Sequence, residues 1–352
     1  MNTKSSFVLL TAAALGACAT PGIDYEARLM ASSPDAAETR SVAVDRFHGP
    51  ASGWFTAQFE SMVANAYFDG TPWFTLTSYP QPDGPDRAGT YAGDIDLISY
   101  DWHEYHRTIK KCVEWDGLFD CETRAEVEQI CLEQSVEVAV TPRLIDASTG
   151  HIVFSNTYYG DAHRDHCEDA YYGSGKHRGK GHFGGYGHHS GWIGLTEYSA
   201  PPDLMREALN ETLWPIRVDI APRNATVRAT FVTEALDPVV RADPRFEQAV
   251  DMAASDPFGA CDTWVELSGQ YPESPAITHN MGACAEASTD YVAAQGLYGQ
   301  AAELSVKYTA DGAIGRDFVK ALNKLADQRE GEQLIDRLNG VSDLIVGEDP
   351  IS

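Results

Sequence analysis

Apolar positions along the chain follow two different periods, and this difference divides the chain into two regions. Alternating or continuous apolar runs indicate strands at 41–47, 73–77, 90–110 and 136–140, and a strand–turn–strand at 144–154. Helix spacing marks a first helix with Phe55, Phe59, Met62, Val63, Ala66 and Tyr67. A second helix, at 204–213, is expected to end at Pro215. This order predicts an α/β domain over residues 41–232, built as a mixed sheet with packing helices.

The pattern of residues 240–340 is helical throughout. Between Phe246 and Val306 the chain has no Lys or Arg but nine acidic residues. We place the boundary between the two regions near 233–243, where Asp237-Pro238 and Asp243-Pro244 occur. The sequence therefore predicts a second, all-α domain after the α/β domain.

The N-terminus contains one apolar stretch, from Phe7 to Leu15. It is far shorter than the ~20 residues that span a bilayer, which favours a secretory signal. The following Leu15-Gly16-Ala17-Cys18 resembles a bacterial lipobox. The resemblance implies a signal peptide at 1–17, a lipid on Cys18, and, because Ala19 follows, an outer-membrane lipoprotein facing the periplasm. Residues 18–40 then form a tether. The alternative is an ordinary cleaved signal with an incidental cysteine.

Six cysteines remain if Cys18 carries the lipid. An even number in an exported chain indicates three disulfides. Cys261 and Cys284 lie almost symmetrically about the turn at 271–275, so a bridge across an antiparallel helix hairpin is expected. The other four should pair among themselves, in an order that the sequence leaves open: Cys112, Cys121, Cys131 and Cys167. A zinc site is the alternative for these four, although no CxxC spacing occurs.

Histidines gather in a Gly-rich insertion at 163–191. It holds six of the eleven in the chain: His163, His166, His177, His182, His188 and His189. Neutral imidazoles bind zinc, copper or nickel, so weak transition-metal binding is one interpretation, and a solvated insertion is the other. His103 and His106 lie in a strand pattern, where residues three apart point to opposite faces, so these two are expected to be separate surface residues.

Charge and motifs exclude some classes of function. With 26 Lys and Arg against 52 Asp and Glu, the 352-residue chain has a net charge of -26, which argues against a nucleic-acid partner. The sequence contains no G-x-S-x-G elbow, H-E-x-x-H helix or P-loop. We therefore expect no enzymatic activity and no firmly bound cofactor.

The α/β region resembles the CsgG-like lipoprotein domain of curli assembly. Three features carry the resemblance: the lipobox, the strand at 41–47 with its helix, and the segment 144–155, which is similar to that family's Asp-x-x-Thr-Gly-x-hydrophobic hairpin. The tail at 216–222 after a helix is also similar. The resemblance implies an assembly factor of the cell envelope, or alternatively a subunit of an oligomeric secretion complex. The amphipathic transmembrane hairpins of pore-forming members have no counterpart in this sequence.

The helical region resembles a tetratricopeptide repeat. Trp264, Leu267 and Tyr271 match the spacing of one unit, and Met281-Gly282, Ala294, Tyr298 and Ala301 match the next. Such repeats bind proteins, and a stretch without cations suits a basic or polar partner. The resemblance suggests these groove residues: Trp264, Tyr271, Asn280, Tyr291 and Tyr298. We thus expect a membrane-anchored, protein-binding scaffold, with metal handling by the histidine-rich insertion as a further alternative.

Overall fold

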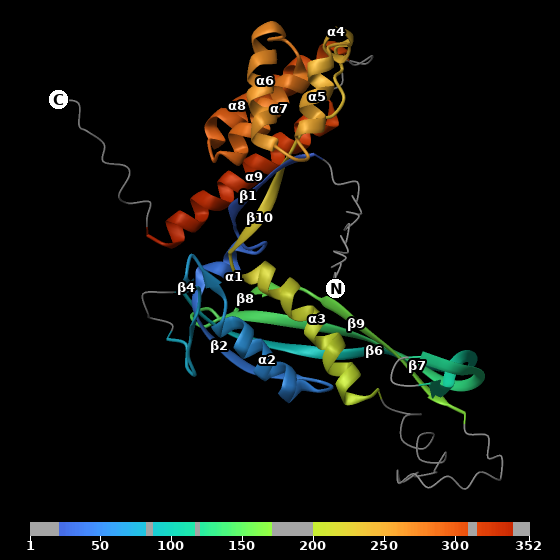
Figure 1. Ribbon diagram of the computed structural model, residues 1–352. Helices are drawn as coiled ribbons and strands as arrows, with labels where there is room; N and C mark the ends of the chain where they lie inside the picture. The colour runs from blue at the N-terminus through green and yellow to red at the C-terminus, as the bar shows by residue number, and fades with distance from the viewer. Residues whose placement is uncertain (1–20, 82–86, 117–119, 171–199, 309–314, 341–352) are drawn as a thin grey trace, which may run out of the picture. The chain divides into compact units, whose positions relative to one another are not determined.

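The computed structural model describes residues 21–81, 87–116, 120–170, 200–308 and 315–340 (Figure 1). The chain forms two compact units, of which one contains residues 30–223 and the other contains residues 1–29 and 224–352. The first unit is therefore an insertion in the second. Within the described ranges, no helix is both long and apolar enough to cross a membrane.

The inserted unit is built on a mixed sheet with the strand order β5-β2-β6-β7-β8, and β9 also pairs with β7. Strand β2 is parallel to β5 and β6, whereas β7 is antiparallel to β6, β8 and β9. The elements are α1 (Pro34–Glu38), β2 (Thr39–His48), α2 (Ser52–Ala64), β3 (Tyr67–Phe68), β4 (Thr71–Pro72), β5 (Thr75–Leu76), β6 (Arg87–Asp116), β7 (Asp120–Asp146), β8 (Ile152–Ser155), β9 (Tyr158–Asp169) and α3 (Pro202–Ile220). The predicted α/β architecture is confirmed at this level.

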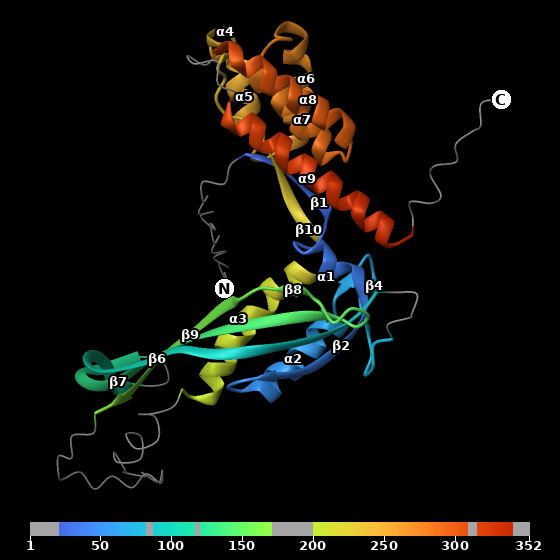
Figure 2. The ribbon, with the colours of Figure 1, turned by 180° about the vertical axis from the view of Figure 1, so that it is seen from behind.

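Helices α2 and α3 cover one face of this sheet, and Figure 2 shows the other face from behind. The core under α2 is aromatic, because Phe47 of β2 lies 5.0 Å from the rings of both Phe55 and Phe59, and Phe59 lies 5.2 Å from Tyr91 of β6. Helix α3 lies so close to β9 that a Cβ on Gly160 would come within 2.0 Å of the Ala208 carbonyl oxygen. This face is the hydrophobic core of the unit.

The turn predicted between β7 and β8 is present, and a carboxylate organises it. Asp146 Oδ1 accepts hydrogen bonds from the backbone N–H groups of Ser148 and Thr149, each at 2.9 Å. Gly150 follows with a φ of 70°, a conformation that favours glycine. The Ser148 hydroxyl and the Arg87 guanidinium hold the pKa of Asp146 well below its usual range.

Helix α3 is longer than predicted, since it continues through Pro215 to Ile220. The tail expected from residue 216 is therefore helical. Ile216 and Ile220 are both fully buried. Their burial contributes about 1.5–3 kcal/mol each, which offsets the ~3 kcal/mol cost of an interior proline. Arg217 completes the helix end by donating to the carbonyl oxygens of Ala221 and Tyr67.

The second unit is mainly helical. Its helices are α4 (Pro238–Arg241), α5 (Pro244–Met252), α6 (Pro257–Gln270), α7 (Pro275–Ala287), α8 (Tyr291–Ser305), the 3-10 turn η1 (Val306–Tyr308) and α9 (Arg316–Leu338). Asp237 and Asp243 were expected to mark a domain boundary. Instead each caps a helix, by accepting a hydrogen bond from the N–H of Val239 and Arg245, respectively.

This unit is not purely helical, because it contains β1 (Gly22–Leu29) paired with β10 (Arg223–Thr230). Two predictions are therefore wrong: residues 22–29 do not form a tether, and the boundary lies at 223/224. The physical reason is the alternation of Ile23, Tyr25 and Ala27, which are buried in the core of the helical unit. Residues 34–38, also within the predicted tether, form α1.

Candidate functional site

The longest strands of the inserted unit extend past the ends of α2 and α3 as a three-stranded ribbon (Figure 1). We call this ribbon the arm; it consists of residues 97–116 of β6, 120–137 of β7 and 161–169 of β9. Strand β7 lies in the middle, and β6 and β9 form the two edges. Arg164 of β9 still pairs with Asp203 at the start of α3, and beyond that point the ribbon projects and offers a surface for interactions.

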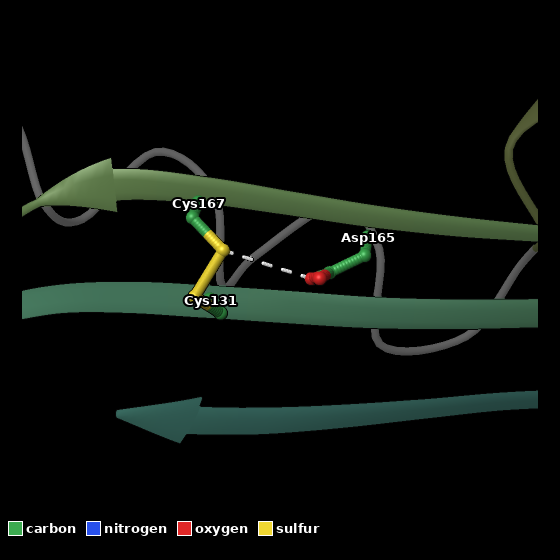
Figure 3. Close-up of side chains that lie close together, drawn as sticks. All are labelled: Cys131, Asp165 and Cys167. Atoms are coloured by element: carbon green, nitrogen blue, oxygen red, sulfur yellow. Dashed lines mark hydrogen bonds between the residues drawn. A yellow bond between two sulfur atoms is a disulfide. The ribbon is translucent and has the colours of Figure 1, made fainter. Parts of the chain in front are cut away.

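Two disulfides brace the arm. Cys112 and Cys121 join β6 to β7 near the hairpin tip, and Cys131 and Cys167 join β7 to β9 at directly opposed positions with a Cα–Cα distance of 4.0 Å (Figure 3). The prediction that these four cysteines pair among themselves is confirmed. Both bridges are cross-strand links, so they fix the register of all three strands.

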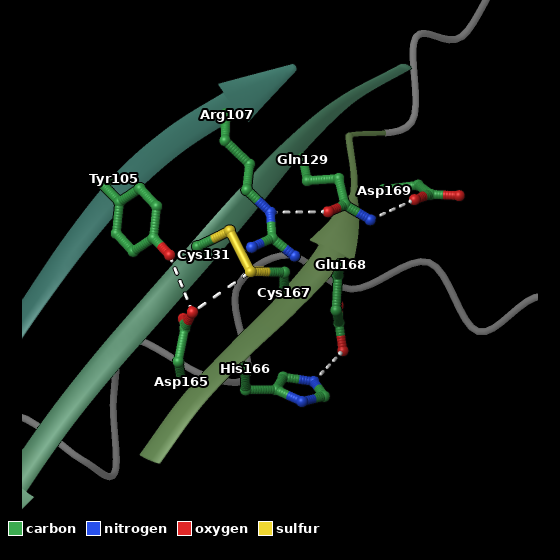
Figure 4. Close-up of a disulfide and its surroundings, with 9 residues drawn as sticks. All are labelled: Tyr105, Arg107, Gln129, Cys131, Asp165, His166, Cys167, Glu168 and Asp169. Carbon is green, nitrogen blue, oxygen red and sulfur yellow. Dashed lines mark hydrogen bonds and ion pairs between the residues drawn. A yellow bond between two sulfur atoms is a disulfide. The ribbon is translucent and has the colours of Figure 1, made fainter. Parts of the chain in front are cut away.

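Polar side chains brace the same face of the arm around Cys131–Cys167 (Figure 4). The Tyr105 hydroxyl on β6 donates to Asp165 Oδ2 on β9 at 2.8 Å, and this bond raises the pKa of Tyr105. A second chain of contacts crosses the ribbon from β6 through β7 to β9. It runs from Arg107 to Gln129 (3.0 Å), from Gln129 to Asp169 (2.9 Å), and from Asp169 to Lys111 (2.5 Å).

Three potential metal ligands meet at this disulfide: Cys131, Asp165 and Cys167, with ligand atoms within 4.8 Å of one another. Both sulfur atoms are bonded to each other, however, and a metal ligand requires a thiolate. The 3.7 Å approach of Cys167 Sγ to Asp165 is accordingly a contact, because a bridged sulfur has no hydrogen to donate. In its oxidised form the arm offers one carboxylate here, so the zinc alternative for these cysteines does not apply.

The histidine predictions divide into two groups. His163 and His166 lie three residues apart on β9, hence on opposite faces, and each has an acidic neighbour, Glu133 and Glu168, respectively. These two do not share a metal. The other four, His177, His182, His188 and His189, lie outside the described residues. The two histidines of β6 are exposed strand residues, as expected: His103 and His106.

Three large apolar side chains of β6 are exposed near the base of the arm. Leu97 is 40% exposed, Ile98 is 50% exposed and Trp102 is 45% exposed. Leu97 pairs with the buried Val138, so its side chain adjoins the core of the unit. Residues 94–102 had suggested only an ordinary strand, and the sequence alone gave no signal that these side chains are uncovered.

Three of the predicted groove residues of the helical unit belong to its core instead. Trp264 is buried against Phe246, at a ring distance of 5.2 Å. Asn280 is fully buried, and Val232 satisfies its side-chain amide. The amide oxygen accepts from the Val232 N–H at 2.7 Å, and the amide nitrogen donates to the Val232 carbonyl at 3.1 Å. Tyr298 is fully buried as well. The assignment of these three to a partner-binding groove is therefore wrong.

The other two groove candidates are partly buried and engaged in hydrogen bonds. The Tyr271 hydroxyl donates to Asp243 Oδ2 at 3.0 Å, and Tyr291 accepts from the Gln328 amide at 3.3 Å. Burial raises the pKa of Tyr291 to about 12. The predicted Cys261–Cys284 bridge between α6 and α7 is confirmed, with a Cα–Cα distance of 5.9 Å.

A buried carboxylate organises the centre of the helical unit. Glu286 accepts from the hydroxyls of Tyr25 (2.7 Å) and Tyr298 (2.6 Å) and from the Lys324 ammonium (2.8 Å). These partners come from β1, α8 and α9, while Glu286 itself is on α7. Burial and the neighbouring carboxylate raise the pKa values of both tyrosines. Sequence reasoning missed this cluster, because Glu286 is indistinguishable there from the surrounding surface acids.

The exposed side of α6 combines apolar and acidic side chains. Phe258 is 61% exposed and Val265 is 59% exposed, and the exposed Asp262 and Glu266 lie beside them at helical spacing. We call these four residues the α6 face. Asp262 and Glu266 have no ion pair among the described residues, and helices α6, α7 and α8 contain no Lys or Arg.

Comparison with known proteins gives no further guide to this surface. The sequence matches no model of a known protein family and no curated protein. The candidate sites therefore stand on geometry: a braced arm and an acidic, partly apolar α6 face.

Proposed function

We propose that the protein is a lipoprotein of the outer membrane, facing the periplasm, that acts as a non-catalytic scaffold or assembly factor by binding another protein. The α6 face carries this proposal. Its two large exposed apolar side chains supply contact area, and its two unpaired carboxylates favour a cationic partner segment. This combination fits an amphipathic helix with a basic flank, a binding mode in which a helix packs onto a helical surface.

The position of β1 supports the anchoring part of the proposal. Strand β1 begins at Gly22, four residues after Cys18. An extended chain covers at most about 3.5 Å per residue, so a lipid on Cys18 would hold this strand within ~14 Å of the membrane. The consecutive antiparallel hairpins of α5 to α8 are consistent with a repeat-like helical unit, which we include in the proposal as tetratricopeptide-like.

Site-specific cross-linking in the native envelope tests the binding surface. A photoreactive amino acid replaces Phe258, and cross-linked peptides are identified by mass spectrometry. We expect one partner protein, linked through a segment of net positive charge, and loss of this product in Asp262→Lys/Glu266→Lys. The matched control is Glu207→Lys/Glu211→Lys, which reverses two exposed acids at the same spacing on α3.

Two results would contradict the proposal. One is an unchanged set of cross-links in the α6 double variant, and the other is equal loss in the α3 control. The localisation is tested separately by replacing Cys18 with Ser. This substitution should release the protein from the outer-membrane fraction if Cys18 carries the lipid.

The alternative proposals are tested by other measurements. A subunit of an oligomeric secretion complex predicts a ring of many copies in the native mass of the gently extracted protein. Metal handling predicts stoichiometric metal uptake that is lost when the histidines between 177 and 189 are replaced. No contact among the described residues favours either alternative over the scaffold.

A further inference from the structure

One edge of the arm has no neighbouring strand within the described chain. Strand β2 pairs with β6 only as far as Asp94, and beyond that point β6 pairs with β7 alone. Between Ser99 and Cys112 the pairing is regular, because the register shifts lie just outside this stretch. The stretch contains no proline. A long regular edge presents a row of backbone N–H and C=O groups to any complementary strand.

Charges along this edge are arranged in two halves. The acidic residues Asp101 and Glu104 come first, and the basic residues Arg107, Lys110 and Lys111 follow. When a strand with this arrangement meets its own copy in an antiparallel sense, the acidic half of one faces the basic half of the other. We propose that a second copy of this chain pairs on the β6 edge, antiparallel and about a twofold axis, so that the arms of two molecules form a continuous sheet.

The side-chain pattern selects one register. A twofold axis perpendicular to the sheet keeps the same face of both copies on one side. Directly opposed side chains then lie on the same face only if one residue of β6 is opposed to its own copy, with the axis midway between them. Centring on residue 104 pairs Asp101 with Arg107 but opposes two Glu104 carboxylates at the axis. Centring on residue 107 pairs Glu104 with Lys110 but opposes two Arg107 guanidinium groups there. Centring on residue 105 places Asp101 opposite Ile109, without unlike-charge pairs. Only centring on His106 opposes Asp101 to Lys111.

In this register the apolar face of the edge also finds a partner. Trp102 lies opposite Lys110 of the second copy, which suits a cation–π contact. Trp102 is half-exposed, and Lys110 is exposed without an ion pair in the described ranges. Lys111 already contacts Asp169, so the second copy's Asp101 would share this ammonium. Each contact occurs twice because of the twofold symmetry.

The groups nearest the proposed axis are His106, with Glu128 at 3.1 Å, and Glu104 and Thr108 on either side along β6. Glu104 of one copy lies opposite Thr108 of the other, and diagonal to Lys110.

The native mass of the full chain in mild detergent, followed over a wide dilution series, tests the association. We expect a dimer that dissociates on dilution. Asp101→Lys should raise the dissociation constant about tenfold or more, because two unlike-charge pairs become like-charge pairs. The double variant Asp101→Lys/Lys111→Asp restores the pairs and should recover the dimer. Asp161→Lys, with the same charge change on the β9 edge, should leave it unchanged.

Cysteine cross-linking tests the register. His106→Cys opposes itself across the axis and should form an intermolecular disulfide. Glu104→Cys and Thr108→Cys oppose each other, so a mixture of the two variants should cross-link more than either alone. A protein that stays monomeric at every concentration would overturn the proposal. So would an uncrosslinked His106→Cys variant, or a dimer that Asp161→Lys dissociates. None of these results bears on the α6 face, so the scaffold proposal is decided separately.

Discussion

Replacing Glu286 is the sharpest test of how the helical unit holds the N-terminal strand. Its carboxylate is buried and is the common acceptor for the Tyr25 hydroxyl of β1 and the Tyr298 hydroxyl of α8. The third partner, Lys324, is 40% exposed and remains hydrated when the carboxylate is removed. The energetic consequence of the substitution is therefore concentrated on the two tyrosines.

Each hydroxyl gives the charged acceptor a hydrogen bond that stabilises by about 2 kcal/mol, whereas a bond to a neutral acceptor contributes about 1 kcal/mol. Glu286→Ala removes both charged bonds, so we expect the free energy of unfolding of this unit to fall by about 4 kcal/mol. Glu286→Gln retains neutral bonds in the same place, and we expect a loss of about 2 kcal/mol. The order of the two variants is as informative as the size of either effect.

Urea unfolding followed by pulsed hydrogen exchange and mass spectrometry measures the two units separately, because peptides report their own unit. With a slope of about 2 kcal/mol per molar urea, the midpoint for α7 and α8 peptides should fall by ~1 M in Glu286→Gln and ~2 M in Glu286→Ala. Glu266→Ala, an exposed acid, is the control. If Glu286→Ala shifts the midpoint no more than this control, the carboxylate does not organise the unit.

Three further predictions concern the same unit. Burial lowers the pKa of His279 to about 4. The unfolded state therefore binds the proton more readily, and the unfolding free energy should fall by about 3 kcal/mol as the pH drops from 6.5 to 4. Urea midpoints measured across this pH range should show the loss, and His279→Gln should remove it. Removing the Cys261–Cys284 bridge with paired serines should lower the unfolding free energy by about 3 kcal/mol, measured by urea titration. Replacing 30–223 with an Asn-Gly turn should leave a folded helical unit with native exchange protection, since β1 ends at Leu29 and its pairing strand β10 begins at Arg223, next to Asn224.

Local patterns in the sequence predicted the parts of the fold that depend on local physics. The alternation at 136–140, the helical spacing from Phe55 to Phe59 and the Asp146–Gly150 turn all appear where expected. The Cys261–Cys284 bridge was predictable because both residues lie at equal distances from one turn. In each case the relevant partners are near in the chain, or related by a simple symmetry.

Features that depend on distant partners were missed. The alternation of Ile23, Tyr25 and Ala27 is visible in the sequence. The strand that pairs with it, β10, comes much later in the chain, after the whole inserted unit. Helix α3 continues through Pro215, and the burial of Ile216 and Ile220 in the fold offsets the cost of the proline. The groove assignment of Trp264 and its neighbours failed for the opposite reason, because large aromatic residues at repeat spacing fill the core of this unit.

The order of the chain links these structural features to the proposed anchor. Strand β1 follows Cys18 almost directly, and Tyr25 fastens that strand to Glu286 at the centre of the helical unit. A lipid on Cys18 would therefore act on the helical unit, while the inserted unit is connected only through the paired ends of β1 and β10. This connectivity separates two tasks within one chain. The lipid would hold the helical unit, and with it the partner-binding α6 face, near the membrane. The inserted unit would contribute the arm, whose β6 edge is suited to pairing with a second copy.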